Sequence, residues 1–417
     1  TVIVALDGAP ERLLARLQQQ QALDGETIER PLLAGDDPLG RFGAMQASRQ
    51  QFYDRADFTI VTDPLDAEQV AETIAGLVRP DATLPSVVLR AGGIESHIHV
   101  QSGLLDHAGS LIRARWPKAQ SATIITDANV GLLHADRLSR VLDEAGLRTT
   151  VISVPAGETS KRWETAGSVV DKLLNAGIQR NDLVIALGGG VVGDLAGFVA
   201  AVTLRGVGIV QIPTSLLAMV DSSVGGKTGI NHATGKNLIG AFYQPPLVLI
   251  DPALLRTLPT RELTQSWAEM VKHAIIQPST PDPLVDDLLR TTERNRLAAQ
   301  QVYGLAMTHL IRRNIALKAS VVEADEREAS LRAILNYGHT IGHAIEASEY
   351  RYLHGEAVGV GIHAANRIAV LEGLIDAATE ARLNDFVSSF GLPGQAVFDP
   401  ATVREKMKAD KKNTANS

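Results

Sequence analysis

Histidines near the end of the chain are the residues best suited to chemistry. His339 and His343 are four residues apart, so on a helix both imidazoles could reach one divalent cation. His354 supplies a third imidazole on an expected loop. No glutamate follows the first histidine, so the general base of a metalloprotease is missing. A solvated helix face is the alternative interpretation of the same pattern.

Helical spacing brings further polar residues onto shared faces. Within an expected helix at 261–276, Glu269, Lys272 and His273 stand at i, i+3 and i+4. A second face, expected on one helix of three turns, comprises Arg332, Asn336, His339 and His343. Polar side chains between apolar neighbours need a reason, and metal or substrate binding is one.

A glycine turn follows the apolar run 184–187. Gly188, Gly190 and Gly193 match G-x-G-x-x-G between an expected strand and an expected helix. Glycine lets the backbone approach a ligand closely, and the N–H groups at a helix start attract phosphate. The turn therefore suggests a pyrophosphate cradle. No acidic residue stands about 20 residues later to bind a ribose, so an ordinary tight turn is the alternative.

Two glycine-lysine pairs follow, at Gly226-Lys227 and Gly235-Lys236. The first is not a Walker loop, because Asp221 occupies the position where that pattern needs glycine. Either pair alone is explained equally well by a solvated turn. Together with the glycine turn, they suggest a pocket for more than one phosphate.

These motifs together resemble the 3-dehydroquinate synthase family. The matching stretches are 187–194, 205–206, 213–227, 235–240 and 268–272. The resemblance extends from about Pro85 to the C-terminus, and several long motifs in the right order are far more specific than one glycine signature. It implies an α/β fold, with a Rossmann-like, mostly parallel sheet domain followed by an all-helical domain that binds metal and substrate.

The resemblance implies that NAD and a divalent metal, zinc or cobalt, are cofactors. It selects Glu269, His339 and His354 as metal ligands and leaves His343 to the substrate. It also implies that acids before the glycine turn, not after it, serve the adenosine half of NAD. The implied NAD-binding residues are Asp127, Asn129, Glu158, Lys161, Gly188, Gly189, Gly190, Asp194, Thr214, Ser215, Asp221, Ser222, Lys227, Lys236 and Thr257.

The implied substrate is the keto-acid phosphate DAHP, which the family converts to 3-dehydroquinate and phosphate in the shikimate pathway of aromatic amino acid biosynthesis. By resemblance, NAD transiently oxidises a hydroxyl, phosphate leaves, the hydride returns, and the ring opens and recloses as a carbocycle. Arg205 reaches across a subunit interface in the family, which implies a homodimer. The implied catalytic residues are Arg205, Asp221, Lys227, Asn237, Lys272, Lys318, Arg332, Asn336 and His343.

Residues 1–80 bear a weaker resemblance to the C-terminal half of a shikimate kinase. The matching residues are Leu6-Asp7, Arg30 to Leu33, Arg49 and Tyr53 to Asp57. The phosphate-binding loop of such a kinase would lie upstream, so productive ATP binding is not expected. A half-domain with solvated arginines is the alternative.

The expected elements divide the chain into three parts, 1–80, 81–260 and 261–417. In the first part we expect a strand at 58–61 and a helix at 63–78 with Asp63 as its cap. In the second, strands alternating with helices imply a parallel sheet whose ligands sit beyond the carboxyl ends of the strands. His97 and His99 stand at i and i+2 along a strand and could bind a metal, but they are expected to face solvent. Both chain ends are expected to be truncated, the C-terminal one just after Lys411 and Lys412.

Composition limits the class of partner. The 417 residues carry a formal net charge of −7, which argues against a general nucleic-acid surface and favours small anions held by local lysines. Without cysteine, any transition metal must use histidine and carboxylate ligands. No apolar run approaches the roughly 20 residues that span a bilayer, and a cytoplasmic setting is expected.

Two other functions stay open on the sequence. A related sugar-phosphate cyclase or a metal-dependent polyol dehydrogenase would share the fold, but the dehydrogenase would turn NAD over and would not need Lys227, Asn237 and Arg205. An inactive fragment is the remaining alternative.

Overall fold

The computed structural model describes residues 2–24, 33, 36–63, 65–78, 80–281, 287–300, 304–348 and 351–409. The chain forms two compact units, one of Thr1–Asp81 with Pro283–Leu310 and the other of Ala82–Asp282 with Ile311–Ser417. The expected boundary at 260 falls inside the second unit, and the division into three parts stays a prediction. Arg30 to Leu32, Lys411 and Lys412 lie outside the described residues.

The first unit contains a small parallel sheet in which β1 (Val4–Asp7) pairs with β2 (Phe58–Val61). Its helices are α1 (Pro10–Asp24), α2 (Pro38–Tyr53), α3 (Ala67–Val78) and α10 (Leu288–Ala299). The expected start of α3 was wrong, because Asp66 rather than Asp63 accepts the N–H of Gln69 in its first turn. Asp63 instead forms an ion pair with Arg290 of α10 at 2.9 Å.

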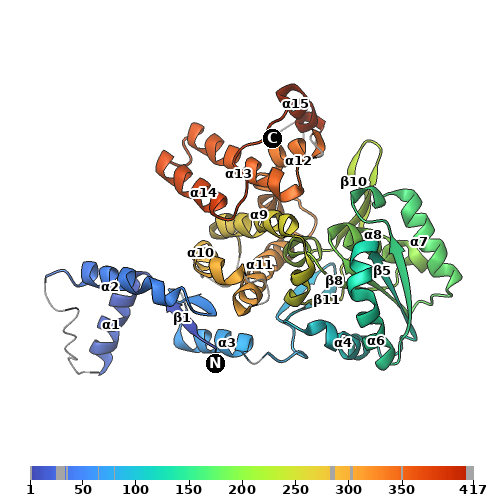
Figure 1. Ribbon diagram of the computed structural model, residues 1–417, viewed down its shortest axis with the longest axis horizontal. Coiled ribbons are helices and arrows are strands. Elements are labelled where there is room, and N and C mark those ends of the chain that lie inside the picture. Colours follow the sequence, from blue (N-terminus) through green and yellow to red (C-terminus); the bar gives the residue numbers. More distant parts are fainter. Residues whose placement is uncertain are drawn as a thin grey trace. The chain divides into compact units, whose positions relative to one another are not determined.

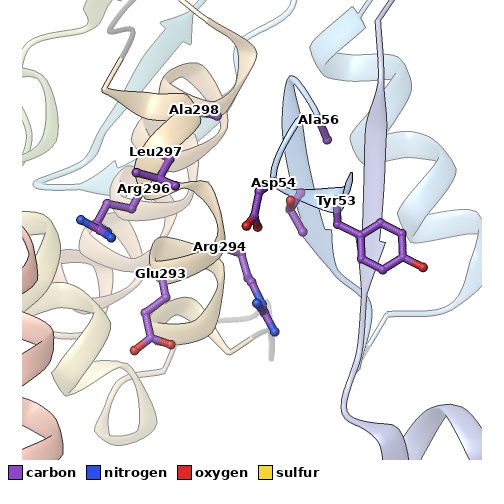
Figure 2. A pocket seen from close by; sticks show the side chains of 9 residues that line it. Tyr53, Asp54, Ala56, Glu293, Arg294, Arg296, Leu297 and Ala298 are labelled. Atoms are coloured by element: carbon purple, nitrogen blue, oxygen red, sulfur yellow. The ribbon is translucent and has the colours of Figure 1, made fainter. Parts of the chain in front are cut away.

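A cavity of about 80 Å³ lies in this unit, between the turn after α2 and helix α10. Figure 2 shows Asp54 and Tyr53 on one side of it and Arg294 and Glu293 on the other. Acidic and basic groups both line the cavity, so its charge favours no particular ion. None of the residues expected to bind metal, cofactor or substrate lines it.

The second unit is built on a seven-stranded sheet with the order β3-β4-β11-β8-β7-β5-β6. Its strands are β3 (Val87–Ala91), β4 (Ile94–Val100), β5 (Ser121–Asp127), β6 (Arg148–Val154), β7 (Leu183–Gly188), β8 (Gly208–Pro213) and β11 (Leu247–Ile250). Every neighbouring pair is parallel except the β3–β4 hairpin. The sequence expectation of a mostly parallel sheet is therefore confirmed.

Helices cover the sheet, so its central strands are apolar throughout. Every residue of β7 and β11 is buried, as expected for parallel strands packed on both faces. The helices of this region are α4 (Ala108–Arg115), α5 (Ala128–Val130), α6 (Asp136–Glu144), α7 (Trp163–Asn175) and α8 (Gly190–Val202). His99 is 4% exposed, and its Nδ1 lies 3.1 Å from the carbonyl oxygen of Ala82, so the expectation that it faces solvent was wrong.

A separate two-stranded hairpin follows β8. Its strands, β9 (Lys227–His232) and β10 (Gly235–Phe242), are antiparallel. The pairing register shifts between Gly235 and Ile239, and Asn237 within that bulge takes a left-handed φ of 57°. This irregularity turns the polar residues of the hairpin tip away from the regular pleat.

Helices make up the rest of the second unit, grouped together in yellow to red in Figure 1. They are α9 (Thr260–Ile276), α11 (Leu305–Ala324), α12 (His339–Ser348), α13 (His354–Leu371), α14 (Ala377–Ser389) and α15 (Pro400–Ala409). The expectation of one helix from Arg332 to His343 was wrong. A short 3-10 turn covers Leu331–Asn336, and Gly338 at a φ of 78° separates it from α12. Within the described residues, no helix is long and apolar enough to span a membrane.

Glycines allow α9, α12 and α13 to approach one another closely. A Cβ on Gly355 of α13 would lie 1.8 Å from the Gln265 carbonyl oxygen of α9. A Cβ on Gly361 would lie 1.9 Å from the carbonyl oxygen of Gly338, just before α12. Side chains at these positions would force the helices apart, so the glycines set the spacing of the groups described next.

Candidate active site

Three side chains from three helices converge where α9, α12 and α13 meet. The Oε1 atom of Glu269 lies 3.4 Å from Nε2 of His339 and 3.4 Å from Nε2 of His354. One ligand atom from each residue fits within 4.8 Å of the other two. Glu269 is fully buried, which isolates its charge from water. The arrangement brings together the three residues expected to bind the metal, and its donor set of one carboxylate and two imidazoles suits zinc or cobalt.

The outer nitrogens of both imidazoles are engaged by acceptors. Nδ1 of His339 lies 3.1 Å from the carbonyl oxygen of Tyr337, and Nδ1 of His354 lies 3.2 Å from Oε2 of Glu346. These contacts favour protons on the Nδ1 atoms, so Nε2 is the nitrogen that each ring presents toward Glu269 and could offer to a metal ion. Burial lowers the pKa of His354, but Glu269 and Glu346 outweigh it and raise that pKa to about 10. The site thus attracts positive charge.

His343 lies on the same helix as His339 but outside the triad. Its ring centroid is 5.0 Å from that of His339 and 5.8 Å from that of His354. A second possible cation group comprises His343, Glu346 and His354, and a third comprises Asp221, Glu269 and His273. In the third group, Asp221 is already paired with Lys318.

Buried cations crowd the space beside the triad. Lys272 is 1% exposed and forms an ion pair with Glu269 one helical turn away. Nζ of Lys318 donates to Oδ1 of Asp221 at 2.5 Å. Burial lowers the pKa of Lys318 and the pKa of Arg332. The charge of Asp221 partly offsets the decrease in each case. A pocket holding desolvated cations is matched to an anionic ligand.

Glu328 is a residue of this pocket that the sequence reasoning missed. Its carboxylate accepts from Nζ of Lys227 at 2.5 Å and from Nδ2 of Asn336 at 2.6 Å. Its backbone has a left-handed φ of 59°, which is strained for a residue with a side chain. The sequence shows only a run of charged residues at 325–328, typical of a solvated turn, and contains no periodic signal that would have singled this one out.

Asp325 anchors the loop that carries Glu328 and Arg332. Its carboxylate accepts from the backbone N–H groups of Ala329, Ser330 and Arg332 at 2.8 to 3.0 Å. These backbone donors lower the pKa of Asp325 to about 2. The carboxylate therefore stays ionised, and the loop stays anchored, throughout the neutral range.

The glycine turn lies at the carboxyl end of β7 and opens α8, as the sequence predicts. A Cβ on Gly190 would lie 3.0 Å from Oγ of Ser222, and one on Gly189 would lie 3.4 Å from Oγ of Ser215. Thr214 closes the turn by donating its N–H to the carbonyl oxygen of Gly188 at 3.0 Å. Small residues facing one another across bare backbone N–H groups fit a pyrophosphate.

Lys161 connects the glycine turn to the hairpin. Its Nζ contacts the carboxylate of Asp194 on α8 and donates to Oδ1 of Asn237 at 2.5 Å. Burial raises the pKa of Asp194, and Lys161 partly offsets the rise. Lys236, beside Asn237, pairs instead with Glu346 of α12 at 2.8 Å. Lys236 is an expected cofactor residue, but its contact is with Glu346, which neighbours the expected metal ligand His354.

The remaining expected cofactor residues follow other strands of the sheet. Asp127 ends β5 and caps the next helix by accepting the N–H of Asn129 at 2.8 Å. Glu158 follows β6 and accepts from Nδ2 of Asn231 on the hairpin at 2.7 Å. Thr257 follows β11, and its hydroxyl lies 3.0 Å from Nε2 of His134. The carboxyl edge of the sheet therefore positions these residues, as expected for a doubly wound fold.

Arg205 is displayed on a strained segment after α8. Leu204, Arg205 and Gly206 all have positive φ angles of 52°, 66° and 118°. The Arg205 side chain is exposed, and within the described part of the chain no hydrogen bond or ion pair engages it. The structure shows no contact between Arg205 and the other residues expected to bind substrate within the described part of this chain.

Comparison with known families matches most of the second unit. The sequence model of the N-terminal part of 3-dehydroquinate synthase matches residues 151–265, and that of the C-terminal part matches residues 266–413. The chain belongs to the 3-dehydroquinate synthase family. The expected family resemblance is therefore confirmed for this part of the chain.

Named 3-dehydroquinate synthases align with the chain over most of their length. That of Desulforamulus reducens is 44% identical over 319 residues, which cover 76% of this chain and 87% of the relative. That of Symbiobacterium thermophilum is 44% identical over 322 residues, with the same shares covered. Both alignments are long enough to include the sheet and most of the helical region.

Solved structures of related sugar-phosphate cyclases share the fold of this 3-dehydroquinate synthase family member. A 2-deoxy-scyllo-inosose synthase complexed with carbaglucose-6-phosphate, NAD+ and Co2+ has a TM-score of 0.67 at 26% identity, covering 75% of this chain and 84% of its own. The 2-epi-5-epi-valiolone synthase of Streptomyces hygroscopicus, with NAD+ and Zn2+ bound, has a TM-score of 0.67 at 29% identity, covering 77% and 88%. An iron-containing alcohol dehydrogenase shares only the fold, at 17% identity.

Proposed function

We propose that the chain is a 3-dehydroquinate synthase, which converts DAHP to 3-dehydroquinate and phosphate in the shikimate pathway. The observation that carries this conclusion is the carboxylate-imidazole triad beside a pocket of buried cations, in a chain 44% identical to named synthases. The dehydrogenase alternative is not favoured, because the metal-dependent alcohol dehydrogenase shares the fold at only 17% identity. The cyclases of other substrates are more distant than the synthases.

NAD and a divalent metal, Zn2+ or Co2+, are the cofactors of this activity, as in the related cyclase structures. The residues present fit both. Glu269, His339 and His354 offer three converging ligand atoms with both Nδ1 atoms already engaged. Gly189 and Gly190 leave the space that a pyrophosphate needs. When bound, NAD supplies a reversible hydride acceptor and the metal supplies a Lewis acid for the hydroxyl being oxidised.

The side chains of the pocket bind and orient the substrate. Lys227, Lys318 and Arg332 carry the positive charge that a phosphate and a carboxylate require. Asn336 offers an amide for a hydroxyl or carboxylate. Because Glu328 now bridges Lys227 and Asn336, an arriving substrate anion must share or replace these contacts. Fixed charges around a desolvated pocket position the reacting groups at little reorganisation cost.

His343 is proposed to act on the substrate rather than on the metal. It lies one turn beyond His339, close to both ligand rings, yet its imidazole is not part of the Glu269 triad. An imidazole at this position could accept a proton from, or donate one to, a substrate oxygen or carbon, as the reaction requires.

Three finer statements also remain proposals. Residues 1–80 are proposed to derive from the C-terminal half of a shikimate kinase, supported by the motifs around Leu6-Asp7 and Tyr53 to Asp57. A homodimer in which Arg205 enters the partner's pocket is supported by its exposure on a strained turn. The third is a cytoplasmic location, which is carried over from the sequence expectation.

The test is the stoichiometry of the reaction with DAHP in the presence of NAD and Co2+. We expect one phosphate released for each DAHP consumed, with no growth of NADH absorbance. Steady NADH formation in step with substrate loss would instead identify a dehydrogenase. Phosphate release that requires another sugar phosphate, and fails with DAHP, would identify a different cyclase.

A further inference from the structure

A chain of polar contacts runs from the β9–β10 hairpin to the metal-binding triad. Nζ of Lys236 lies 2.8 Å from Oε1 of Glu346, and the other carboxylate oxygen of Glu346 lies 3.2 Å from Nδ1 of His354. The opposite nitrogen of His354, Nε2, faces Glu269 at 3.4 Å. One carboxylate therefore joins a lysine of the hairpin to an imidazole expected to bind the metal.

Glu346 accepts the outer hydrogen bond of His354, as a backbone carbonyl does for His339. The Tyr337 carbonyl oxygen lies 3.1 Å from Nδ1 of His339 and fixes the direction of that ring. His339 is further held by its burial, because its side chain is 8% exposed, whereas the His354 side chain is 26% exposed at the start of α13. The ring with less packing around it thus depends more on its outer hydrogen bond for orientation.

Lys236 sits where the hairpin is least regular. It follows Gly235 and precedes Asn237, whose left-handed φ lies within the register shift of β10. Asn237 contacts Lys161, which in turn contacts Asp194 beside the glycine turn. The hairpin tip therefore touches the expected NAD region through one residue and the metal region through the next.

We propose that Glu346 is a positioning residue for the metal ligand His354, and that Lys236 fixes Glu346 so that the hairpin and the metal site are coupled. The inference rests on the metal site of the proposed function and adds a role for two residues outside the triad. The Nδ1 proton donated to Glu346 places the Nε2 lone pair on the metal side and raises the basicity of the imidazole. Lys236, by pairing with the other oxygen, restricts the carboxylate to this orientation.

Two other roles for these residues make different predictions. His343, Glu346 and His354 have ligand atoms within 4.8 Å of one another, so Glu346 could bind a cation directly. If Glu346 were itself a ligand, one nitrogen of His354 would bind a second ion. Removing Glu346 would then lower the number of ions bound by each chain. Lys236 could instead serve NAD alone, in which case its removal would leave metal binding unchanged.

The test measures Co2+ binding to the purified 417-residue chain without NAD, by the visible absorption of the bound ion and by its rate of transfer to a chelator. The variants are Glu346→Leu, which removes the acceptor, Glu346→Gln, which keeps an acceptor without charge, and Lys236→Gln. Glu372→Gln at the exposed end of α13 and Lys118→Gln on the surface are matched controls. Circular dichroism confirms that each variant is folded.

We expect Co2+ affinity to fall about 10- to 100-fold in Glu346→Leu, with a changed absorption band, because loss of an outer partner of a metal-bound histidine has effects of this size. Glu346→Gln should be intermediate, and Lys236→Gln should weaken binding less but in the same direction. Lys236→Gln lies on the exposed hairpin, so it remains informative if a Glu346 variant fails to fold. The stoichiometry should stay at one ion for each chain.

Separate outcomes identify which idea fails. If His354→Ala loses Co2+ but Glu346→Leu binds it with unchanged affinity and spectrum, the positioning role is overturned while the metal site stands. If Lys236→Gln binds Co2+ with unchanged affinity and spectrum, the coupling through the hairpin is overturned. A lower ion stoichiometry in Glu346→Leu would make Glu346 a ligand. If His354→Ala and His339→Ala both retain Co2+, the metal site of the proposed function is itself wrong and this inference with it.

Discussion

Replacing Lys272 by methionine should destabilise the metal-free protein far more than the metal-bound protein. Lys272 and Glu269 form an ion pair whose side chains are 2% and 0% exposed. Removing one partner of a buried pair typically costs about 3 to 5 kcal/mol, because the other charge is left uncompensated. His354 also faces Glu269 at 3.4 Å, so the loss should lie near the lower limit, at about 3 kcal/mol.

A bound divalent cation replaces the missing positive charge. Saturating Co2+ at about 100 times its dissociation constant stabilises a wild-type site by about 2.7 kcal/mol. In Lys272→Met this stabilisation should be larger, because the ammonium that repels the cation is gone and an uncompensated carboxylate binds it. The difference in unfolding free energy between variant and wild type should therefore shrink to about 1 kcal/mol or less with metal.

The assay is urea unfolding followed by circular dichroism, with chelator and with Co2+. Lys172→Met, at an exposed position of α7, is the control and should change neither curve. An equal loss of stability with and without metal would refute the reasoning, because it would show that the cation does not share the carboxylate with Lys272.

Three other predictions concern single residues. His339→Ala should lose both Co2+ and activity, whereas His343→Ala should keep most of the metal and lose turnover; equal metal loss in a dialysis assay would place both imidazoles in the ligand set. Asp325→Ala should lower kcat/KM for DAHP by up to about 100-fold by releasing the loop that carries Arg332. Since the carboxylate has a pKa of about 2, the wild-type loop should stay anchored as pH falls to about 4 and loosen only as pH approaches 2. Arg205→Ala should be inactive alone but regain activity when refolded with His343→Ala, because a mixed dimer has one site with both residues intact; no recovery would contradict a role across the interface.

Local patterns in the sequence were sufficient for the sheet and the helix of Glu269. The apolar run before Gly188 forms β7, and the i, i+3, i+4 spacing of Glu269, Lys272 and His273 lies on α9 as expected. Both signals depend on burial and periodicity, which a single sequence records directly. The ligand set itself came from the family resemblance, because spacing alone could not choose among three histidines.

Features that depend on a left-handed backbone conformation, or on contacts between residues far apart in the sequence, could not be predicted. The helix expected from Arg332 to His343 is broken because Gly338 takes a left-handed conformation, which spacing does not reveal. Asp66 rather than Asp63 caps α3. The sequence could not distinguish the two, because both are acidic residues near the same turn. Glu328 was missed because its partners are Lys227, about a hundred positions earlier in the chain, and an asparagine on the next turn.

The contact between Gly338 and Gly361 has a consequence for protein engineering. A Cβ at Gly338 would also lie 2.7 Å from Cγ1 of Ile362, so neither glycine can be substituted without pushing α13 away from the start of α12. Directed evolution toward a new sugar phosphate should therefore find almost no accepted mutations at this crossing, even though neither glycine carries a reactive group. Libraries would be better aimed at exposed hairpin positions such as Ala233, which lies outside the contact between Lys236 and Glu346.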